Sequence, residues 1–376
     1  DIIYATPKSV TYEILKNVGI KYVIIDECDF STQENSHISD LLKSLKIKSL
    51  LGLTATPFYM HKGSEGTEVK IMTQVKGSLF KDICFVNQIQ EMVQNKYWSD
   101  LQYLDFTEDD GNTLQLNDSQ LEYTEESIDT FYEKFNIEPR VKELLLRIPK
   151  NESVLIFVSG IKNCEKLSES IEGSAFVHSK MKNKDRKEVI DKFKSGKLKV
   201  LVNSQVLLTG FDAPIITNII DILPTNSIRT QIQKTGRGIR IMEGKKFCRI
   251  LDLVGNFKRF GDVRDLNFEY IEGYGWGFFK KDILLTDVPQ NFIGQTTKSS
   301  LRKYKKPIKE YRFGEHNPGD AIIDFGQFKK NPKKVIELYI KKRHYLKWLA
   351  FSDFQFKDKE LERQIKTIWN VPYEQH

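Results

Sequence analysis

The stretch Tyr22-Val-Ile-Ile-Asp26-Glu27-Cys28-Asp29 indicates the fold class, because an apolar run of strand length ends directly in acidic side chains. A continuous apolar run of this length is typical of a strand in a parallel sheet, which is buried on both faces. Open α/β sheets bind ligands beyond the carboxyl ends of their strands. Asp26 and Glu27 therefore stand where a Mg²⁺ ion and a reacting water can be held. The alternative is a plain strand that leads into an acidic loop.

Short β-rich runs alternate with amphipathic stretches through the first 262 residues. Such alternation is typical of parallel sheets that are covered by helices on both faces. The sequence therefore predicts strands at 22–26, 49–54, 154–158, 175–178, 200–203, 218–222 and 249–253. It predicts helices at 8–18, 36–46, 161–172 and 183–195, and further helical patterns at 333–350 and 358–369.

The formal net charge of +7 is distributed unevenly along the 376 residues. Residues 1–262 carry 36 basic and 36 acidic side chains, whereas residues 298–348 carry 15 basic and 5 acidic ones. A concentrated basic excess favours a polyanion such as nucleic acid, because each phosphate contact releases counterions. A solvated lysine-rich face is the alternative. The candidates for phosphate contacts in this segment are Lys341, Lys342, Arg343 and Lys347.

Residues 99–130 are the opposite extreme, with ten acidic side chains and no Lys or Arg. Turn formers such as Gly111 and Asn112 lie among them. We interpret the stretch near 106–125 as an acidic linker or insertion that separates two α/β regions. The first of these regions is short of strands.

Composition excludes several classes of protein. No apolar run approaches the roughly 20 residues that a membrane-spanning helix needs. The four cysteines are widely separated and form no CxxC pair, so a disulfide scaffold or a zinc ribbon is not expected. The cysteine pattern predicts a protein of the reducing cytosol. A composition rich in Lys, Ile, Asn and Phe favours a bacterial cell or a phage-infected host.

Two further stretches carry groups that can act at such a site. In Thr54-Ala55-Thr56-Pro57, two hydroxyls follow a predicted strand and can couple one site to another through hydrogen bonds. In Thr209-Gly210-Phe211-Asp212, the glycine permits close approach to a phosphate, and Asp212 can accept from a ribose or pair with an arginine. A plain strand-to-loop exit is the alternative for the threonine pair.

The stretch Gln233-Lys-Thr-Gly236-Arg237-Gly-Ile-Arg240 is a third stretch whose side chains can act at such a site. Its two arginines are three residues apart, which predicts that they share one helical face, with Gln233 a further turn back. Paired guanidinium groups suit a transferring phosphoryl group because of their planar fork of donors. The alternative is a basic surface turn, which the two glycines make less favourable.

Taken in order, these blocks resemble superfamily 2 helicases and translocases, which are ATP-driven motors with two RecA-like domains. Thr6-Pro7 resembles motif Ib, Asp26–Asp29 motif II, and 54–57 motif III. Residues 154–159 resemble motif IV, 209–214 motif V in its restriction-type and phage form, and 233–240 motif VI. The resemblance covers about residues 1–262.

The resemblance implies a role for each matching residue. Asp26 would hold Mg²⁺ through water, Glu27 would be the base for water attack, and Arg237 and Arg240 would be arginine fingers. Gln233 would sense the γ-phosphate, Gly210 and Asp212 would bind the nucleotide, and Thr54 and Thr56 would couple hydrolysis to movement. Thr6 and Thr209 would contact the tracked nucleic-acid strand. The implied cofactors are ATP and Mg²⁺.

The phosphate loop G-x-x-x-x-G-K-[ST] of such motors does not occur in these 376 residues. With Asp1 as the first residue, this leads us to expect a fragment whose missing amino-terminal segment carries the Walker A loop. The chain alone is then expected to be inactive.

The sequence therefore predicts an α/β protein with two RecA-like parallel-sheet domains, the first truncated, and a small basic C-terminal α+β domain. The expected boundaries are 1–105, an acidic linker at 106–130, 131–262, and a nucleic-acid-binding accessory domain at 263–376. The predicted function is an ATP-dependent DNA helicase or translocase, with RNA as the alternative polyanion. Two alternative functions are a non-catalytic nucleic-acid-binding protein and the motor subunit of a restriction-type complex.

Overall fold

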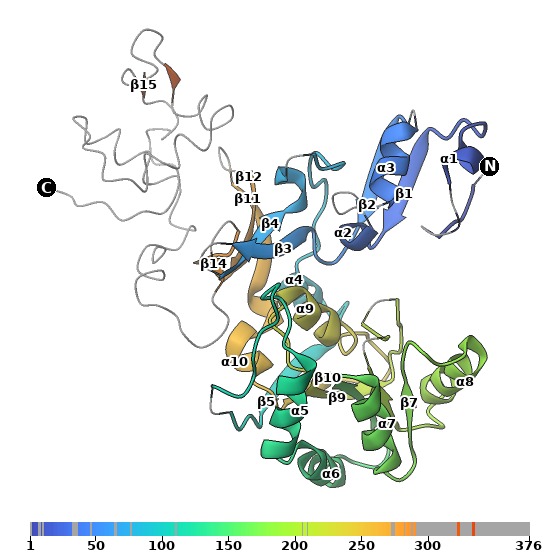
Figure 1. Cartoon of the computed structure of the whole chain (residues 1–376), viewed down its shortest axis with the longest axis vertical. Helices are drawn as coiled ribbons and strands as arrows, with labels where there is room; N and C mark the ends of the chain where they lie inside the picture. The colour runs from blue at the N-terminus through green and yellow to red at the C-terminus, as the bar shows by residue number, and fades with distance from the viewer. Residues whose placement is uncertain are drawn as a thin grey trace, which may run out of the picture. The chain divides into compact units, whose positions relative to one another are not determined.

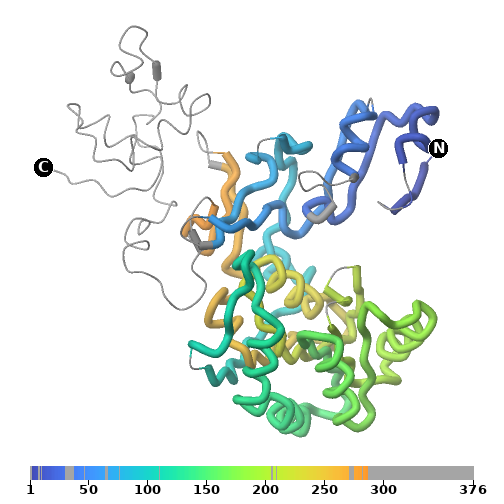
Figure 2. Tube along the Cα trace, viewed as in Figure 1, coloured from blue at the N-terminus to red at the C-terminus, as the bar shows by residue number. Residues whose placement is uncertain are grey.

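The computed structural model describes residues 2–6, 9, 11–31, 37–45, 47–63, 66–75, 77–109, 111–204, 206–208, 210–271, 275–281, 283–286 and 289–290, together with 322–323 and 333–334. The chain divides into two units, and the division falls between Arg264 and Asp265. Figure 1 shows the elements, and Figure 2 follows the path of the chain through them.

A six-stranded parallel sheet is the centre of the first unit. Its strands, in spatial order, are β5 (Asp100–Asp105), β10 (Phe247–Asp252), β9 (Ile216–Ile222), β6 (Ser153–Val158), β8 (Val200–Asn203) and β7 (Ser174–Val177). All six residues of β6 are buried, as expected for a central strand whose residues are almost all apolar. The parallel α/β architecture that the sequence predicts is confirmed, and the sheet resembles that of a RecA-like domain.

Helices cover this sheet on both faces. Val154, Ile156 and Val158 alternate onto one face of β6 and pack in a core with side chains of α5 (Glu125–Lys134), α6 (Ile137–Arg147) and α7 (Ile161–Glu169). The intervening Leu155 and Phe157 are equally buried on the opposite face. The helices α8 (Asn183–Lys194), α9 (Ile228–Gly236) and α10 (Asn256–Phe260) complete this region (Figure 1).

The first hundred residues hold a second, smaller parallel pair, in which β1 (Tyr22–Asp26) lies beside β2 (Ser49–Leu53). The strands alternate between exposed and half-buried residues, and Tyr22 and Ile24 expose 70% and 68% of their surface. Parallel strands are normally covered on both faces. The face of the β1–β2 pair that bears Tyr22 and Ile24 is therefore unusually apolar for a surface exposed to solvent.

The remaining elements of the first unit are short. The hairpin of β3 (Phe58–Gly63) and β4 (Gly66–Ile71) follows β2 directly. The short helices are α1 (Tyr12–Leu15), α2 (Cys28–Ser31), α3 (His37–Ser44), η1 (Met72–Gln74), α4 (Ile89–Gln94) and, at the division of the units, η2 (Val263–Asp265).

In the second unit, β11 (Leu266–Ile271), β12 (Gly275–Lys280) and β13 (Ile283–Leu284) form an antiparallel sheet. The strands β14 (Pro289–Gln290), β15 (Ile322–Ile323) and β16 (Lys333–Lys334) have two residues each. The helix predicted at 333–350 is wrong at its start, because Lys333 and Lys334 belong to β16, which pairs with β15. Residues 335–350 and 358–369 lie outside the described part of the chain.

All seven predicted strands of the first 262 residues are present, with ends that differ by at most two residues. The acidic stretch contains two elements that its composition did not indicate, β5 and the start of α5. The domain boundaries at 105, 130 and 262 stay predictions. Among the described helices, none has the length and apolar character needed to span a bilayer.

Candidate active site

Three acidic side chains lie at the carboxyl end of β1 and just beyond it, and each has a different environment. Asp26 is exposed, and its Oδ1 accepts a hydrogen bond from the Glu27 backbone N–H at 3.0 Å. Glu27 has a φ of +48°, in the left-handed region that non-glycine residues rarely adopt. Backbone strain of this kind costs about 1–3 kcal/mol and clusters at functional sites. Asp29, in contrast, is buried with only 1% of its surface exposed.

The buried Asp29 carboxylate joins three segments of the chain. Its Oδ1 accepts from Thr54 Oγ1 and its Oδ2 from Thr56 Oγ1, each at 2.7 Å. Arg229 of α9 places its Nε 3.3 Å from Asp29 Oδ2 and donates through Nη2 to the Phe58 carbonyl at 2.6 Å. The end of β1, the loop after β2 and the helix α9 therefore meet at one carboxylate, which offsets the cost of burying its charge.

Glu27 and Arg237 lie within each other's electrostatic influence. Burial raises the pKa of Glu27, and the neighbouring carboxylates of Asp29 and Asp26 raise it further. The positive charges of Arg237 and Arg229 oppose this rise in pKa. Burial lowers the pKa of the Arg237 guanidinium, and Glu27 counteracts that change. The charges of an acid and an arginine from distant parts of the sequence thus influence each other.

Arg237 and Arg240 both contact the segment that follows Gly210. Arg237 donates through Nη1 to the Phe211 carbonyl, and Arg240 Nε lies 3.5 Å from Asp212 Oδ1. Gly210 itself has a φ of +64°, a conformation that favours glycine. The predicted nucleotide-binding and arginine-finger residues are therefore neighbours.

The expectation of one shared helical face for the two arginines is wrong. The helix α9 ends at Gly236, so Arg237 is its C-cap and Arg240 lies in the irregular segment beyond it. Lys245 and Ser99 hold this segment through its carbonyls. Lys245 Nζ donates to the carbonyls of Gly238 and Arg240, each at 2.7 Å, and Ser99 Oγ donates to that of Arg240 at 2.9 Å.

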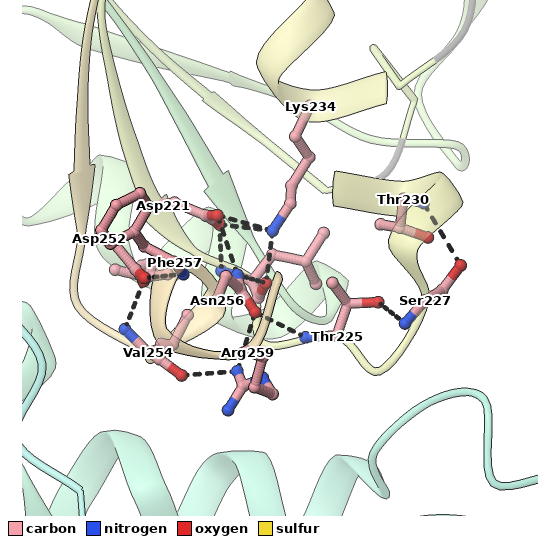
Figure 3. Close-up of polar contacts among 12 residues, drawn as sticks. Asp221, Thr225, Ser227, Thr230, Lys234, Asp252, Val254, Asn256, Phe257 and Arg259 are labelled. Carbon is pink, nitrogen blue, oxygen red and sulfur yellow. Dashed lines mark hydrogen bonds and ion pairs between the residues drawn. The ribbon is translucent and has the colours of Figure 1, made fainter. Parts of the chain in front are cut away.

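A buried polar network anchors α9 to the sheet (Figure 3). Lys234, with 1% of its surface exposed, donates to Asp221 Oδ1 and Oδ2 at 2.8 and 2.7 Å and to the Leu223 carbonyl at 2.9 Å. Asn256 Nδ2 donates to Asp221 Oδ2 and to the same carbonyl, each at 2.9 Å. Burial lowers the pKa of Lys234, whereas Asp221 favours its charged form. The helix is thus fixed at a side chain that lies between Gln233 and Arg237.

Comparisons with known proteins relate the chain to helicases. The sequence profile of the family described as "Helicase conserved C-terminal domain" matches residues 138–242. The predicted helicase 22 of Sulfolobus islandicus filamentous virus (isolate Iceland/Hveragerdi) is 27% identical over 286 residues, which is 70% of this chain and 48% of that protein. Residues 138–242 thus match the helicase C-terminal family, and the longer similarity to a viral helicase makes the chain helicase-like. It spans about half the length of the viral relative.

Two further comparisons show similarity to a phage protein and to a solved structure. The 51.5 kDa protein of Lactococcus phage (isolate 7-9) is 25% identical over 60% of the chain and 48% of the phage protein. Among solved structures, a fragment of a predicted HsdR subunit of a type I restriction enzyme from Vibrio vulnificus YJ016 has the same fold. Its TM-score is 0.53 at 18% identity, covering 68% of this chain and 48% of that one.

In terms of the motifs that the sequence resembles, Asp29 joins motif II to motif III through Thr54 and Thr56, and Arg237 and Arg240 join motif VI to motif V. Arg229, which also contacts Asp29, lies four residues before motif VI. The side chain of Thr6, from motif Ib, is exposed and hydrogen-bonds locally to Ser9. The side chains of Thr209, Lys341, Lys342, Arg343 and Lys347 lie outside the described residues. The catalytic and binding roles of all these positions stay predictions.

Sequence reasoning assigned no role to Arg229, Lys234, Asp221 or Asn256. Asp221 had a recognisable signal, because it stands near the end of an apolar strand as Asp26 does. Arg229 lies four residues before Gln233, one turn away on the same helix, and this spacing could have suggested a shared task. Nothing in the sequence indicated that Lys234 is buried.

Proposed function

We propose that this chain belongs to an ATP-dependent DNA translocase or helicase of superfamily 2. The observation that carries the proposal is the meeting of strand-end acids with α9: Asp29 contacts Arg229, and Glu27 lies in the field of Arg237. A protein that only binds nucleic acid has no physical need for a strained, partly buried glutamate within the electrostatic influence of an arginine. A motor needs both groups at one phosphoryl group.

Glu27 is suited to act as the general base. Its raised pKa brings the carboxylate closer to the operating pH, which makes it a better proton acceptor in the transition state. In this proposal Glu27 orients the attacking water and takes its proton. Arg237 and Arg240 stabilise the charge that develops on the transferring phosphoryl group, and Gln233 senses its presence.

Asp26 fits an indirect role in binding Mg²⁺. Its carboxylate is exposed at the strand end, and Mg²⁺ prefers oxygen ligands while keeping several waters. Bound Mg²⁺ would neutralise phosphate charge during transfer. Asp29 is unsuited to this role because Thr54, Thr56 and Arg229 already occupy both of its oxygens.

The same contacts support a coupling role for Thr54 and Thr56. Both hydroxyls donate to the carboxylate that pairs with Arg229, so a movement of α9 changes the surroundings of the loop after β2. In the proposed cycle, nucleotide hydrolysis alters this network and shifts Thr6 and Thr209 along a DNA strand. The basic segment with Lys341, Lys342, Arg343 and Lys347 holds DNA through its phosphates.

ATP binding requires a phosphate loop, and we propose that a segment outside these 376 residues supplies it. The exposed apolar face of the β1–β2 pair supports this idea, because Tyr22, Ile24, Leu51 and Leu53 present a surface that a further βα unit would cover.

The test is ATP hydrolysis by the complete encoded protein, measured alone and with single-stranded DNA, duplex DNA or RNA. We expect DNA to stimulate hydrolysis, and we expect Glu27→Gln to lower kcat by about 10²- to 10⁴-fold. The exposed acid Glu169 provides the matched control, Glu169→Gln, which should leave kcat unchanged.

Two results would contradict the proposal. If DNA is bound in a salt-sensitive manner without any hydrolysis, the protein is a nucleic-acid-binding protein with a helicase shape. If RNA alone stimulates hydrolysis, the motor assignment stands but its substrate is RNA.

A further inference from the structure

The acidic stretch contains an ordered hairpin that the proposed chemistry does not use. Leu116 and Tyr123 form an antiparallel bridge, and the Asn117 N–H donates to the Glu122 carbonyl at 2.8 Å. At the tip, Gln120 has a φ of +58°, and its N–H donates to the Asn117 carbonyl at 2.9 Å. We call residues 113–124 the linker hairpin. It is a folded element, although its composition resembles that of a solvated linker.

One side of the linker hairpin contacts the β3–β4 hairpin. The buried Thr67 of β4 donates through Oγ1 to the Gln120 carbonyl at 3.1 Å. Lys62 of β3 donates through Nζ to the Asp118 carbonyl at 3.2 Å. Both acceptors are backbone carbonyls, so the contacts depend on the path of the hairpin rather than on its acidic side chains.

The other side contacts the amino-terminal end of α9. Asn226 Nδ2 donates to the Gln120 carbonyl at 2.7 Å, so this one carbonyl accepts from both neighbours. Glu122 accepts from Thr225 Oγ1 at 3.0 Å through one carboxylate oxygen and from Thr230 Oγ1 at 3.4 Å through the other. A carboxylate beside a helix amino terminus is favoured by the helix dipole.

The position of α9 matters because of what it carries. Arg229 lies next to Thr230 and reaches Asp29 and the Phe58 carbonyl, whereas Arg237 is at the far end of the helix. Lys234 fixes the helix to its own sheet. The linker hairpin therefore supplies a second attachment, at the other end of α9 and toward β3–β4.

We propose that the linker hairpin is a strut that sets the orientation of α9 toward the acids after β1, and that Glu122 is the positioning residue at its contact with the helix. Glu122 does not touch the reacting atoms. It acts through Thr225 and Thr230, which fix the turn that bears Arg229. The catalytic meaning of the strut rests on the proposed function, whereas its geometric effect does not.

The geometric effect can be measured in the 376-residue chain by distances between spin labels. The exposed residues Lys43 of α3 and Glu188 of α8 are replaced by cysteine to carry the spin labels. The exposed Cys84 is replaced by serine so that it takes up no label. The other native cysteines, Cys28, Cys164 and Cys248, are buried. We expect one narrow distance distribution for the parent. Glu122→Ala and, separately, Asn226→Ala should broaden or shift it.

Glu125→Ala is the matched control, because Glu125 is an exposed acid in the first turn of α5, three residues from Glu122. Its distance distribution should equal that of the parent. Far-ultraviolet circular dichroism establishes that each variant is folded. If one contact variant fails to fold, the other decides the outcome. If a folded contact variant has the same spin-label distance distribution as the parent, the proposal that the linker hairpin orients α9 is wrong.

Steady-state kinetics of the complete protein give the second readout. We expect Glu122→Ala to lower kcat about 10- to 100-fold with little change in the KM for ATP, since misplaced catalytic groups lose rate rather than ground-state binding. An unchanged kcat beside a broadened distance distribution would overturn the positioning role. Absence of ATPase activity in the parent protein would overturn the proposed function. The spin-label distances would still test whether the linker hairpin orients α9.

Discussion

Single polar side chains do much of the positioning in this molecule, and they do so in buried surroundings. Lys234 is enclosed by Asp221 and the Leu223 carbonyl, and Asn256 satisfies the same two acceptors (Figure 3). Asp29 is similarly satisfied by two threonine hydroxyls and Arg229. A buried charge is tolerated only when such partners are complete, so removing one partner leaves another uncompensated.

Lys234→Met should therefore destabilise the fold by about 3–5 kcal/mol, because the buried Asp221 carboxylate loses its cationic partner. The measurement is the free energy of unfolding in urea. Lys234→Met combined with Asp221→Asn should cost less than the sum of the two single changes, since the neutral amide no longer needs a cation. Single-variant losses below about 1 kcal/mol, or additive losses in the pair, would show that the network contributes little.

At the scale of elements, apolar strands could be predicted and polar ones could not. The strands 22–26 and 154–158 could be predicted because nearly every residue in them is apolar, although only the second of them is fully buried. β5 was missed because Asp100, Gln102 and Asp105 make it look like part of a linker, although it pairs with β10 along its whole length. The β3–β4 hairpin was missed for the same reason, since His61, Lys62 and Glu68 interrupt its apolar pattern.

The end of α9 was also misjudged, and the cause is a packing constraint. A Cβ at Gly238 would lie 2.6 Å from Cys248 Sγ and 3.1 Å from Ile219 Cδ1, so this segment packs against the sheet more closely than any side chain permits. At Gly236 nothing lies within 4 Å of the same position. The two glycines of one motif thus serve different purposes.

Gly238→Ala should destabilise the chain by about 1–3 kcal/mol through overpacking. Gly236→Ala, its matched control, should be neutral or stabilising by up to about 1 kcal/mol, because alanine is favoured over glycine in a helix. Thermal unfolding of both variants checks this. Equal effects of the two substitutions would refute the packing argument, and Cys248→Ala should relieve the clash in the Gly238→Ala background.

At the scale of the molecule, the contact between Asp29 and Arg229 joins residues that are 200 positions apart in the sequence. Motif order predicted that Asp26, Glu27 and Arg237 would cooperate, but only as an implication of family resemblance. The Asp29–Arg229 pair and the linker hairpin could not be predicted, because composition and periodicity report local structure and carry no information on which distant side chains meet.

The exposed face of the β1–β2 pair leads to a further prediction. In the 376-residue chain, Ile24→Ser should change the free energy of unfolding by less than about 0.5 kcal/mol, because Ile24 is exposed. In a complete protein whose additional segment covers this face, the same change should cost about 2–4 kcal/mol. Equal costs in both proteins would mean that no segment packs there.

The central claim is that Glu27 and Arg237 act together on one phosphoryl group. The most direct test is DNA-stimulated kcat for Glu27→Gln, Arg237→Ala and the double variant of the complete protein. We predict a loss of about 10³- to 10⁵-fold for the arginine variant and a double variant no slower than the slower single one, as for residues that act as a unit. Losses that multiply, or a single variant that retains the parent rate, would contradict the account.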